Sequence, residues 1–196
     1  MKINKQSLLL ENDSIYLRPL QVEDITDEYV NGLNDPDVNK YLVNVRLNVQ
    51  TFKSVEKYVK SNMENPHAIL FGIFVKHDAK SLIGTVFVSG IDFFHFLASV
   101  GVCLFAKRAW RKGYGFSALE KVKNYLFGQL GLHYIEAGVY AENIQSVKLF
   151  QRVDFLEMYR VNNKYRYIDS FKEVIIFGVI NPLFDVSLIK QNNLMD

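Results

Sequence analysis

A cationic, glycine-containing segment between an apolar stretch and an amphipathic one constrains this chain more than any other feature. It spans Lys107–Ala118 and reads KRAWRKGYGFSA. Its glycines, Gly113 and Gly115, permit positive φ and let a ligand approach the backbone without a Cβ in the way. The helix expected to follow presents unpaired N–H groups and the positive end of its dipole, which suit a phosphate. The segment therefore favours anion binding over the alternative, a solvated basic loop.

The hydrophobic pattern on either side of this segment predicts a mixed α+β fold. Helices are expected over 24–34, from a cap at Thr51, and over 116–127 and 144–152, with turns at 35–37 and 77–80. Strands are expected over 14–20, 69–75, 82–91, 98–105, 134–140, 155–161, 165–168 and 174–180. Two helices, an antiparallel meander and then alternating strands and helices are typical of one mixed sheet. We expect one domain over 10–181 and a C-terminal tail over 182–196.

Composition narrows the classes of function. The chain has 196 residues, 49% hydrophobic and 22% charged, with a formal net charge of +2, which indicates a water-soluble globule. A near-neutral charge gives no support for nucleic-acid binding. The single cysteine, Cys103, cannot form an internal disulfide. No apolar run reaches the about 20 residues that a membrane span needs. The basic start lacks the apolar stretch of a signal peptide. The expectation is a cytoplasmic protein with no nucleic-acid or membrane partner.

Three phosphate-binding patterns compete for the glycine segment. The P-loop pattern Gly-x-x-x-x-Gly-Lys-Ser/Thr is not present. Gly113–Ala118 does satisfy the dinucleotide pattern Gly-x-Gly-x-x-Gly/Ala, and Glu142 is placed to bind a ribose. However, residues 106–112 separate the preceding strand from Gly113, whereas a dinucleotide fold turns directly from its strand into its glycines. The parallel βαβ units of that fold also conflict with the expected antiparallel meander.

The third pattern fits better. Trp110–Gly115 (WRKGYG) resembles the pyrophosphate-binding motif Gln/Arg-x-x-Gly-x-Gly/Ala of the GNAT superfamily of N-acetyltransferases, in the Trp-containing form of its Rim-type ribosomal-protein branch. Other family stretches follow in the family's order. Residues 14–20 resemble its opening strand, 83–85 its central hairpin, 98–102 the start of its fourth strand, and 143–155 its Asn-x-x-Ser…Gly-Phe segment. The resemblance implies the α+β GNAT fold, with a mostly antiparallel sheet of about seven strands flanked by helices.

The resemblance also implies how acetyl-CoA, the co-substrate, is held. The family's fourth strand diverges from its fifth, so the main chain of Val102, Cys103 and Leu104 is expected to accept the pantetheine arm. The pyrophosphate is expected on the amides of 112–117, and Asn143 near the pantetheine or acetyl group, unless it serves only as a helix N-cap. The expected cofactor-binding residues are Val102, Cys103, Leu104, Arg111, Lys112, Gly113, Tyr114, Gly115, Phe116, Ser117, Asn143 and Phe150.

The implied reaction is direct attack of a neutral primary amine on the thioester, followed by protonation of the thiolate. Many members use a Tyr for that proton, but this chain has Phe150 in its position and Asp154 in place of a nearby glycine. Ser146 is the expected substitute, or an ordinary first-turn serine, and Asn143 is the other expected catalytic residue. Other eligible acids are Tyr140 and Tyr165, and eligible bases are Asp92, His95, Glu136, Glu142 and Asp169. The histidines and Cys103 lack paired ligand spacing, so no metal is expected.

The resemblance therefore implies acetyl transfer to a primary amine, on a protein N-terminus or an amino-sugar nucleotide. The acceptor is expected near Tyr41, Arg46, Tyr165 and Tyr167. An acidic pocket there favours a cationic peptide, and a basic, aromatic one favours a sugar nucleotide. Two alternatives stay open: a CoA-binding module that has lost catalysis, and a dinucleotide-binding enzyme. The chain is expected to be a monomer or a homodimer.

Overall fold

One sheet organises the residues that the computed structural model describes, 3–78, 81–168 and 170–192. Its strands lie in the order β1-β2-β3-β4-β5-β6-β8-β7. Neighbouring strands pair antiparallel except for β5 and β6, which are parallel. The strands are β1 (Leu10–Glu11), β2 (Ile15–Pro19), β3 (Ile69–Val75), β4 (Ser81–Asp92), β5 (Leu97–Cys103), β6 (Tyr134–Tyr140), β7 (Leu156–Tyr167) and β8 (Ser170–Ile180).

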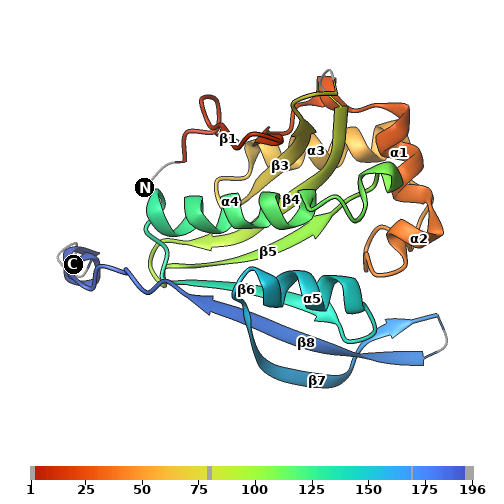
Figure 1. Ribbon diagram of the computed structural model, residues 1–196. Coiled ribbons are helices and arrows are strands. Elements are labelled where there is room, and N and C mark those ends of the chain that lie inside the picture. The colour runs from red at the N-terminus through yellow and green to blue at the C-terminus, as the bar shows by residue number, and fades with distance from the viewer. Residues whose placement is uncertain (1–2, 79–80, 169, 193–196) are drawn as a thin grey trace.

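Helices cover both faces of this sheet, with α4 on one side and α3 on the other (Figure 1). Phe71 on β3 contacts Tyr125 of α4, and Phe87 on β4 contacts Tyr58 of α3. Phe71 pairs with Val86, the neighbour of Phe87, so the two phenylalanines point to opposite faces. The helical elements are η1 (Val22–Asp24), α1 (Asp27–Asn34), α2 (Pro36–Asn39), α3 (Phe52–Glu64), η2 (Lys107–Ala109), α4 (Tyr114–Gly128), α5 (Ile144–Arg152) and α6 (Ser187–Asn192).

The expected α+β fold with a mixed, mostly antiparallel sheet is confirmed. Strands at 69–75 and 134–140 and the helix at 144–152 have the expected bounds. The described residues form an 8-stranded sheet rather than one of about seven, because β1 has only two residues and no alternation that reveals it. The antiparallel order of β1 to β5 excludes the dinucleotide-binding fold, which needs parallel βαβ units.

Two expectations near the first helices are wrong. Residues 35–37 do not form a simple turn but begin α2, because the Asp35 side chain accepts from the Asp37 amide and Pro36 stands at the first helical positions. The helix expected from residue 24 begins at Asp27, because the Thr26 side chain caps it. Local capping chemistry thus overrides the broader hydrophobic pattern.

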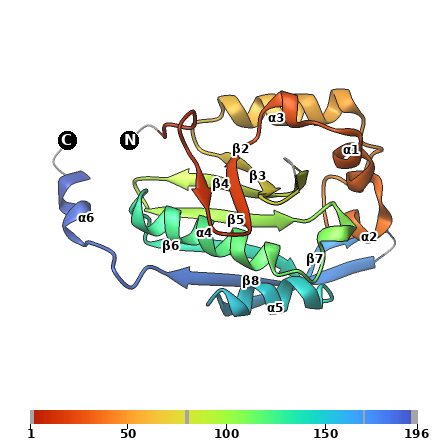
Figure 2. The same cartoon turned by 45° about the horizontal axis from the view of Figure 1, so that its top comes forward.

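The C-terminal expectations need a further correction. The separate strands expected over 155–161 and 165–168 are one strand, β7, which continues through a register shift between Val161 and Tyr165. The expected tail contains the short helix α6, which lies beyond the sheet at the C-terminal end of the chain (Figure 2). The turn expected over 77–80 is described only as far as Asp78, since Ala79 and Lys80 lie outside the described residues. No helix in the described ranges is long and apolar enough to cross a bilayer.

Candidate active site

β5 and β6 separate partway along their length. They pair only over residues 97–99 and 134–136. Beyond that point β5 stays paired with β4 as far as Cys103, while β6 stays paired with β8 as far as Tyr140. The facing edges therefore lack a strand partner from Val100 onward, and their backbone groups are open to a ligand. The divergence expected from the family resemblance is confirmed in these two strands.

A cleft of 1360 Å³ continues from this gap to the first turns of α4 and α5. All of the expected cofactor-binding residues line it except Lys112 and Ser117. The two expected catalytic residues, Asn143 and Ser146, line it as well. The fold thus brings strand ends, the glycine segment and α5 together around one space.

The loop before α4 borders the cleft and leaves most of its amides without an acceptor in the described residues. Arg111 and Gly113 both take left-handed backbone conformations, with φ of 60° and 82°. A Cβ on Gly113 would meet nothing within 4 Å, so the space beside it is open. Among the described residues, no group accepts a hydrogen bond from the amides of 111–116. The amide of Ser117, by contrast, donates to the Gly113 carbonyl at 3.0 Å, so it is not free for a phosphate as expected.

Trp110 fixes this loop to the end of β5. Its Nε1 donates to the carbonyl oxygen of Leu104 at 2.8 Å. The strand expected to run to residue 105 ends at Cys103, so Leu104 lies just beyond it. The Leu104 carbonyl oxygen therefore already accepts one hydrogen bond and has a lone pair left for a second, so the expected pantetheine contact of the Leu104 main chain stays a prediction. No local sequence pattern indicates this indole contact.

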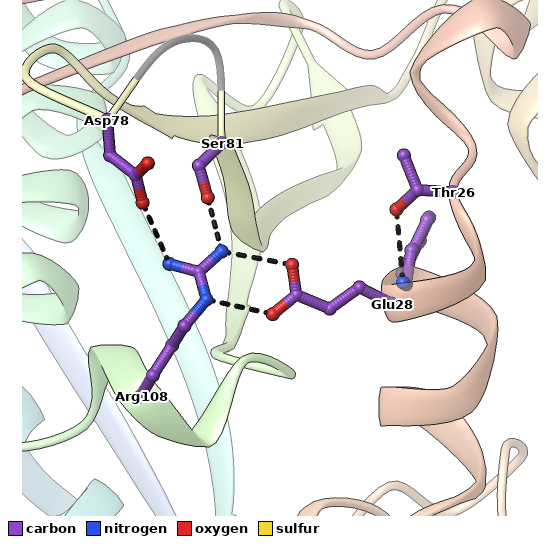
Figure 3. A network of polar contacts seen from close by, with 6 residues as sticks. Thr26, Glu28, Asp78, Ser81 and Arg108 are labelled. Carbon is purple, nitrogen blue, oxygen red and sulfur yellow. Dashed lines mark hydrogen bonds and ion pairs between the residues drawn. The ribbon is translucent and has the colours of Figure 1, made fainter.

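Arg108, in the turn η2 just before the loop, is held by two other segments (Figure 3). Its Nε and Nη2 donate to the two carboxylate oxygens of Glu28 on α1, each at 2.9 Å. Its Nη1 donates to Asp78 Oδ2 at 3.2 Å, and Nη2 also donates to Ser81 Oγ. These contacts hold the start of the loop against α1 and against the β3–β4 connection.

α5 presents Asn143 and Ser146 to the cleft from its first turn. The Asn143 Oδ1 accepts from the Ser146 amide at 3.3 Å, which is the contact of an N-cap. Within the described ranges, neither the Asn143 Nδ2 nor the Ser146 hydroxyl has a hydrogen-bond partner. Phe150 is 3% exposed and packs against Phe155 and Phe177. Capping the helix therefore leaves both polar groups of the turn able to meet a ligand.

Two cations of α5 that the sequence analysis did not select also line the cleft. Lys148 and Arg152 stand one helical turn apart, and the Arg152 guanidinium lies 4.4 Å from the centre of the Phe116 ring. Neither they nor Arg111 form an ion pair among the described residues. Their spacing of four residues places both on one helix face, which is the signal that could have identified them.

Tyrosines gather beside the cleft, and three of them, Tyr41, Tyr140 and Tyr165, line it. The tyrosine cluster consists of Tyr41, Tyr140, Tyr165 and Tyr167, with Tyr140 at its centre: its ring lies 5.6 Å from Tyr41, 5.9 Å from Tyr165 and 6.4 Å from Tyr167. The Arg46 guanidinium lies 4.4 Å from the centre of the Tyr167 ring and donates to the Tyr140 hydroxyl at 3.1 Å. The residues expected near the acceptor therefore lie together.

Titratable groups eligible as bases are mostly away from the cleft. Of those described, only Glu142 lines it, and its carboxylate accepts from Lys172 Nζ at 2.7 Å. Asp92 accepts from the amides of Phe94 and His95, with that of His95 the largest cause of a lowered Asp92 pKa. Asp169 lies outside the described residues.

Cys103, the single cysteine of the chain, lines the cleft at the end of β5. Burial raises its pKa to about 12, so the nucleophilic thiolate is scarce at neutral pH. In the described part of the chain, no group of three or more His, Cys, Asp or Glu side chains is placed to hold a metal.

Comparison with known proteins agrees with this geometry. Residues 14–156 match the sequence profile of the acetyltransferase (GNAT) domain. The uncharacterized N-acetyltransferase p20 of Bacillus licheniformis is 30% identical over 147 residues, covering 74% of this chain and 81% of that protein. The uncharacterized N-acetyltransferase YoaA of Bacillus subtilis is 27% identical over 181 residues, covering 89% and 97%.

Solved structures share the fold. Spermidine N-acetyltransferase from Vibrio cholerae, in complex with CoA and spermine, has 21% identity and a TM-score of 0.77, covering 87% of this chain and 97% of that one. A Vibrio cholerae protein described as a candidate ribosomal-protein-serine acetyltransferase has 21% identity and a TM-score of 0.72, covering 90% and 99%. The profile match spans most of the chain, and this protein therefore belongs to the GNAT family and is an acetyl-CoA-dependent N-acetyltransferase.

Proposed function

We propose that acetyl-CoA binds with its pantetheine arm between β5 and β6 and its pyrophosphate at the N-terminus of α4. The observation that carries this proposal is the continuity between the unpaired strand edges and the unpartnered amides of 111–116. Helix N-termini attract phosphate through such amides and through the helix dipole. Val102 and Cys103 supply main-chain groups to the pantetheine, and Arg111 faces the pyrophosphate as a counter-charge.

Lys148 and Arg152 extend this positive surface along α5. Both line the same cleft as Arg111, and none of the three has an ion-pair partner in the described residues. An unpaired cation beside a bound phosphate makes a charge-assisted contact, which is stronger than a neutral hydrogen bond. Lys112, which does not line the cleft, contributes through its amide and its longer-range charge.

The acetyl group then lies beside the first turn of α5, where a primary amine attacks the thioester carbonyl directly. The ammonium form of the amine first loses a proton through water to bulk solvent, which is feasible because an α-amino group has a pKa of about 7.7–8.0. Once the C–N bond has formed, the nitrogen loses a second proton by the same route. The tetrahedral oxyanion takes a hydrogen bond from a backbone amide of the open β5 edge. When the C–S bond breaks, the Ser146 hydroxyl passes a proton to the thiolate and recovers one from solvent.

Ser146 takes this role because the usual acid position holds Phe150, which has no proton to give. The Ser146 hydroxyl lines the cleft and has no partner among the described residues. Asn143 donates from Nδ2 to the pantetheine while its Oδ1 continues to cap α5. The helix cap and the ligand contact use different atoms of one side chain.

The acceptor is a primary amine, on a protein N-terminus or on an amino-sugar nucleotide. The Trp-containing motif at 110–115 and the neighbour described as acting on ribosomal-protein serine support placement in the Rim-type branch. The spermidine-acetylating neighbours raise a polyamine as a second acceptor. However, of the described carboxylates that line the cleft, Glu142 pairs with Lys172, and Asp37 shares Lys107 with Asp35. These pairs leave only one unbalanced negative charge for a polycation.

Thiol release from acetyl-CoA, measured with a panel of amines, tests the proposed function. Ser146→Ala is expected to lower kcat by about a hundredfold, since general acid catalysis contributes about 10²–10⁴, with little change in the Kd of acetyl-CoA. Ser61→Ala on the exposed face of α3 is the matched control and keeps the wild-type rate. Binding of acetyl-CoA without thiol release across the whole panel would instead support a module that has lost catalysis. An unaltered kcat for Ser146→Ala would remove Ser146 from the mechanism.

A further inference from the structure

Three cations without a carboxylate partner among the described residues contact the tyrosine cluster: Lys40, which lines the cleft, and Arg46 and Lys164, which do not. Lys40 Nζ lies 5.2 Å from the centre of the Tyr41 ring, and Lys164 Nζ lies 5.4 Å from the centre of the Tyr165 ring. Arg46 reaches the same cluster from the loop after α2. None of these three cations pairs with a carboxylate among the described residues.

The described carboxylates that line the cleft each contact a lysine. Glu142 is the nearest one that lines the cleft, and Lys172 holds it at 2.7 Å while Lys172 Nζ also lies 5.7 Å from the centre of the Tyr167 ring. Asp37, further along the cleft wall, shares Lys107 with Asp35, at 2.7 Å and 2.8 Å, so these three side chains together keep one negative charge. Among the described residues, the three cations Lys40, Arg46 and Lys164 outnumber this one unbalanced negative charge, so their field attracts anions and repels polycations.

Arg46 also holds together the segments that surround the tyrosine cluster. Its Nη1 donates to the Lys40 carbonyl at 2.8 Å, and its Nη2 donates to the Arg166 carbonyl at 2.7 Å as well as to the Tyr140 hydroxyl. The guanidinium thus joins three segments while keeping its full charge, because all of its acceptors are neutral. An anion beside it meets a charge that is already in position.

The tyrosine cluster adds ring faces and hydroxyl groups to this field. Tyr140 is 5% exposed and Tyr165 is 37% exposed, so the cluster has a buried centre and an accessible rim. Aromatic faces pack against the apolar face of a sugar or a base, and phenol hydroxyls hydrogen-bond to sugar hydroxyls. From this combination we infer that the acceptor is an amino sugar that carries phosphate, its ring against the tyrosine cluster and its phosphate near Lys40, Arg46 and Lys164.

This inference rests on the proposed function and narrows its acceptor. A peptide acceptor with a basic sequence would require carboxylates in the site. A peptide with any other sequence does not require them, but its flexible N-terminus offers no fixed anion to the three cations and no ring to the tyrosines. A phosphorylated sugar supplies both on one compact molecule. Its phosphate belongs either to a free sugar phosphate or to a nucleotide diphosphate, which share the chemistry that the site recognises.

Matched acceptors of different charge test the inference. The purified full chain is assayed for thiol release with glucosamine, glucosamine 6-phosphate, uridine-diphosphate-linked glucosamine, spermidine and a peptide with a free N-terminus. We expect kcat/KM for at least one phosphorylated form to exceed that for glucosamine about tenfold or more, since one charge-assisted contact is worth about 1.5–3 kcal/mol. Added salt is expected to narrow this ratio by screening the exposed cations. The preferred phosphorylated form identifies the source of the phosphate.

Substitution at Lys40 provides a second readout. Lys40 is exposed, so Lys40→Gln is expected to keep the fold while reducing the ratio of kcat/KM for the phosphorylated over the neutral sugar by about fivefold. Lys60→Gln on α3, which removes an exposed lysine paired with Glu56 and away from the cleft, is the matched control and leaves the ratio at its wild-type value.

Two failures are distinguishable. If the proposed function is wrong, no acceptor in the panel releases thiol, whether or not calorimetry detects acetyl-CoA binding. If only the inference is wrong, thiol is released but glucosamine, spermidine or the peptide is used as well as or better than both phosphorylated sugars.

Discussion

Lys123 on α4 donates from Nζ to Asp154 Oδ2 at 3.0 Å and to the neighbouring Val153 carbonyl at the same distance. Asp154 has a φ of 66°, in the left-handed region that favours glycine. It stands where the family resemblance places a glycine, just after the end of α5. Aspartate tolerates this conformation better than most side chains, and the ion pair to Lys123 holds it there. The departure from the family pattern is therefore compensated locally.

Asp154→Ala is expected to destabilise the fold by about 1–2 kcal/mol. The left-handed φ is unfavourable for alanine, and alanine cannot form the ion pair with Lys123. Asp154→Asn keeps a side chain that tolerates this φ and loses only the exposed charge, which contributes about 0–1 kcal/mol. Asp154→Gly removes the backbone cost altogether. Urea unfolding of the three variants measures the order of stability. If the alanine variant is as stable as the asparagine one, backbone conformation is not what this position requires.

The Arg108–Glu28 pair is expected to act on acetyl-CoA affinity more than on stability. Both side chains are nearly half exposed, so Glu28→Gln lowers the free energy of unfolding by under about 1 kcal/mol. The same change frees the start of the phosphate loop, and the Kd of acetyl-CoA is expected to rise about threefold. Glu56→Gln, which breaks the exposed pair with Lys60 on α3, is the control. Equal Kd values for the two variants in calorimetry would show that Arg108 does not position the loop.

Two substitutions of Gly113 distinguish the effect of a negative charge on acetyl-CoA binding from the effect of a changed backbone conformation. Asparagine and aspartate are nearly the same size and both tolerate a left-handed φ, and a Cβ at this position meets nothing within 4 Å. Gly113→Asp is therefore expected to weaken acetyl-CoA binding at least about tenfold more than Gly113→Asn, because it adds a negative charge beside the pyrophosphate. Calorimetric titration with acetyl-CoA measures both. Equal affinities would place the pyrophosphate elsewhere.

The strongest sequence predictions concerned features that are contiguous in the chain. Tyr134–Tyr140 and Ile144–Arg152 were predicted with the correct bounds because their periodic apolar residues lie within one element. The glycine loop was predictable for the same reason, since its glycines and cations are adjacent. β1 and α2 were missed because so few residues show no period and are fixed by pairing or capping.

Contacts between distant segments were not predictable in this way. Arg46 and Tyr140 are separated by 94 positions, and no local sequence pattern predicts that the Arg46 guanidinium donates a hydrogen bond to the Tyr140 hydroxyl. The hydrogen bond from Trp110 to the Leu104 carbonyl spans few residues, but it depends on where β5 ends. The hydrophobic pattern predicts that end at residue 105, whereas the strand ends at Cys103. Family resemblance grouped Tyr41, Arg46, Tyr165 and Tyr167 by location, while their charge balance required the folded arrangement.

Cys103 predicts how stability changes in alkaline solution. Burial raises its pKa from an ordinary 9.0 to about 12. Between these values the unfolded chain has lost the thiol proton while the folded chain keeps it, so the unfolded state binds fewer protons and the free energy of unfolding falls as pH rises. This contribution reaches about 1.4 kcal/mol by about pH 10.

Urea unfolding at about pH 7.5 and about pH 10, for the wild type and for Cys103→Ala, measures this contribution. The alanine variant is expected to be less stable at the lower pH, because it loses buried sulfur contacts, but to lose about 1.4 kcal/mol less between the two pH values. Tyr58, whose pKa burial raises to about 12, titrates in both proteins and cancels in the comparison. Parallel losses in the two proteins would mean that the Cys103 thiol ionises as readily in the folded chain as in the unfolded one, and that water reaches it between the diverging strands.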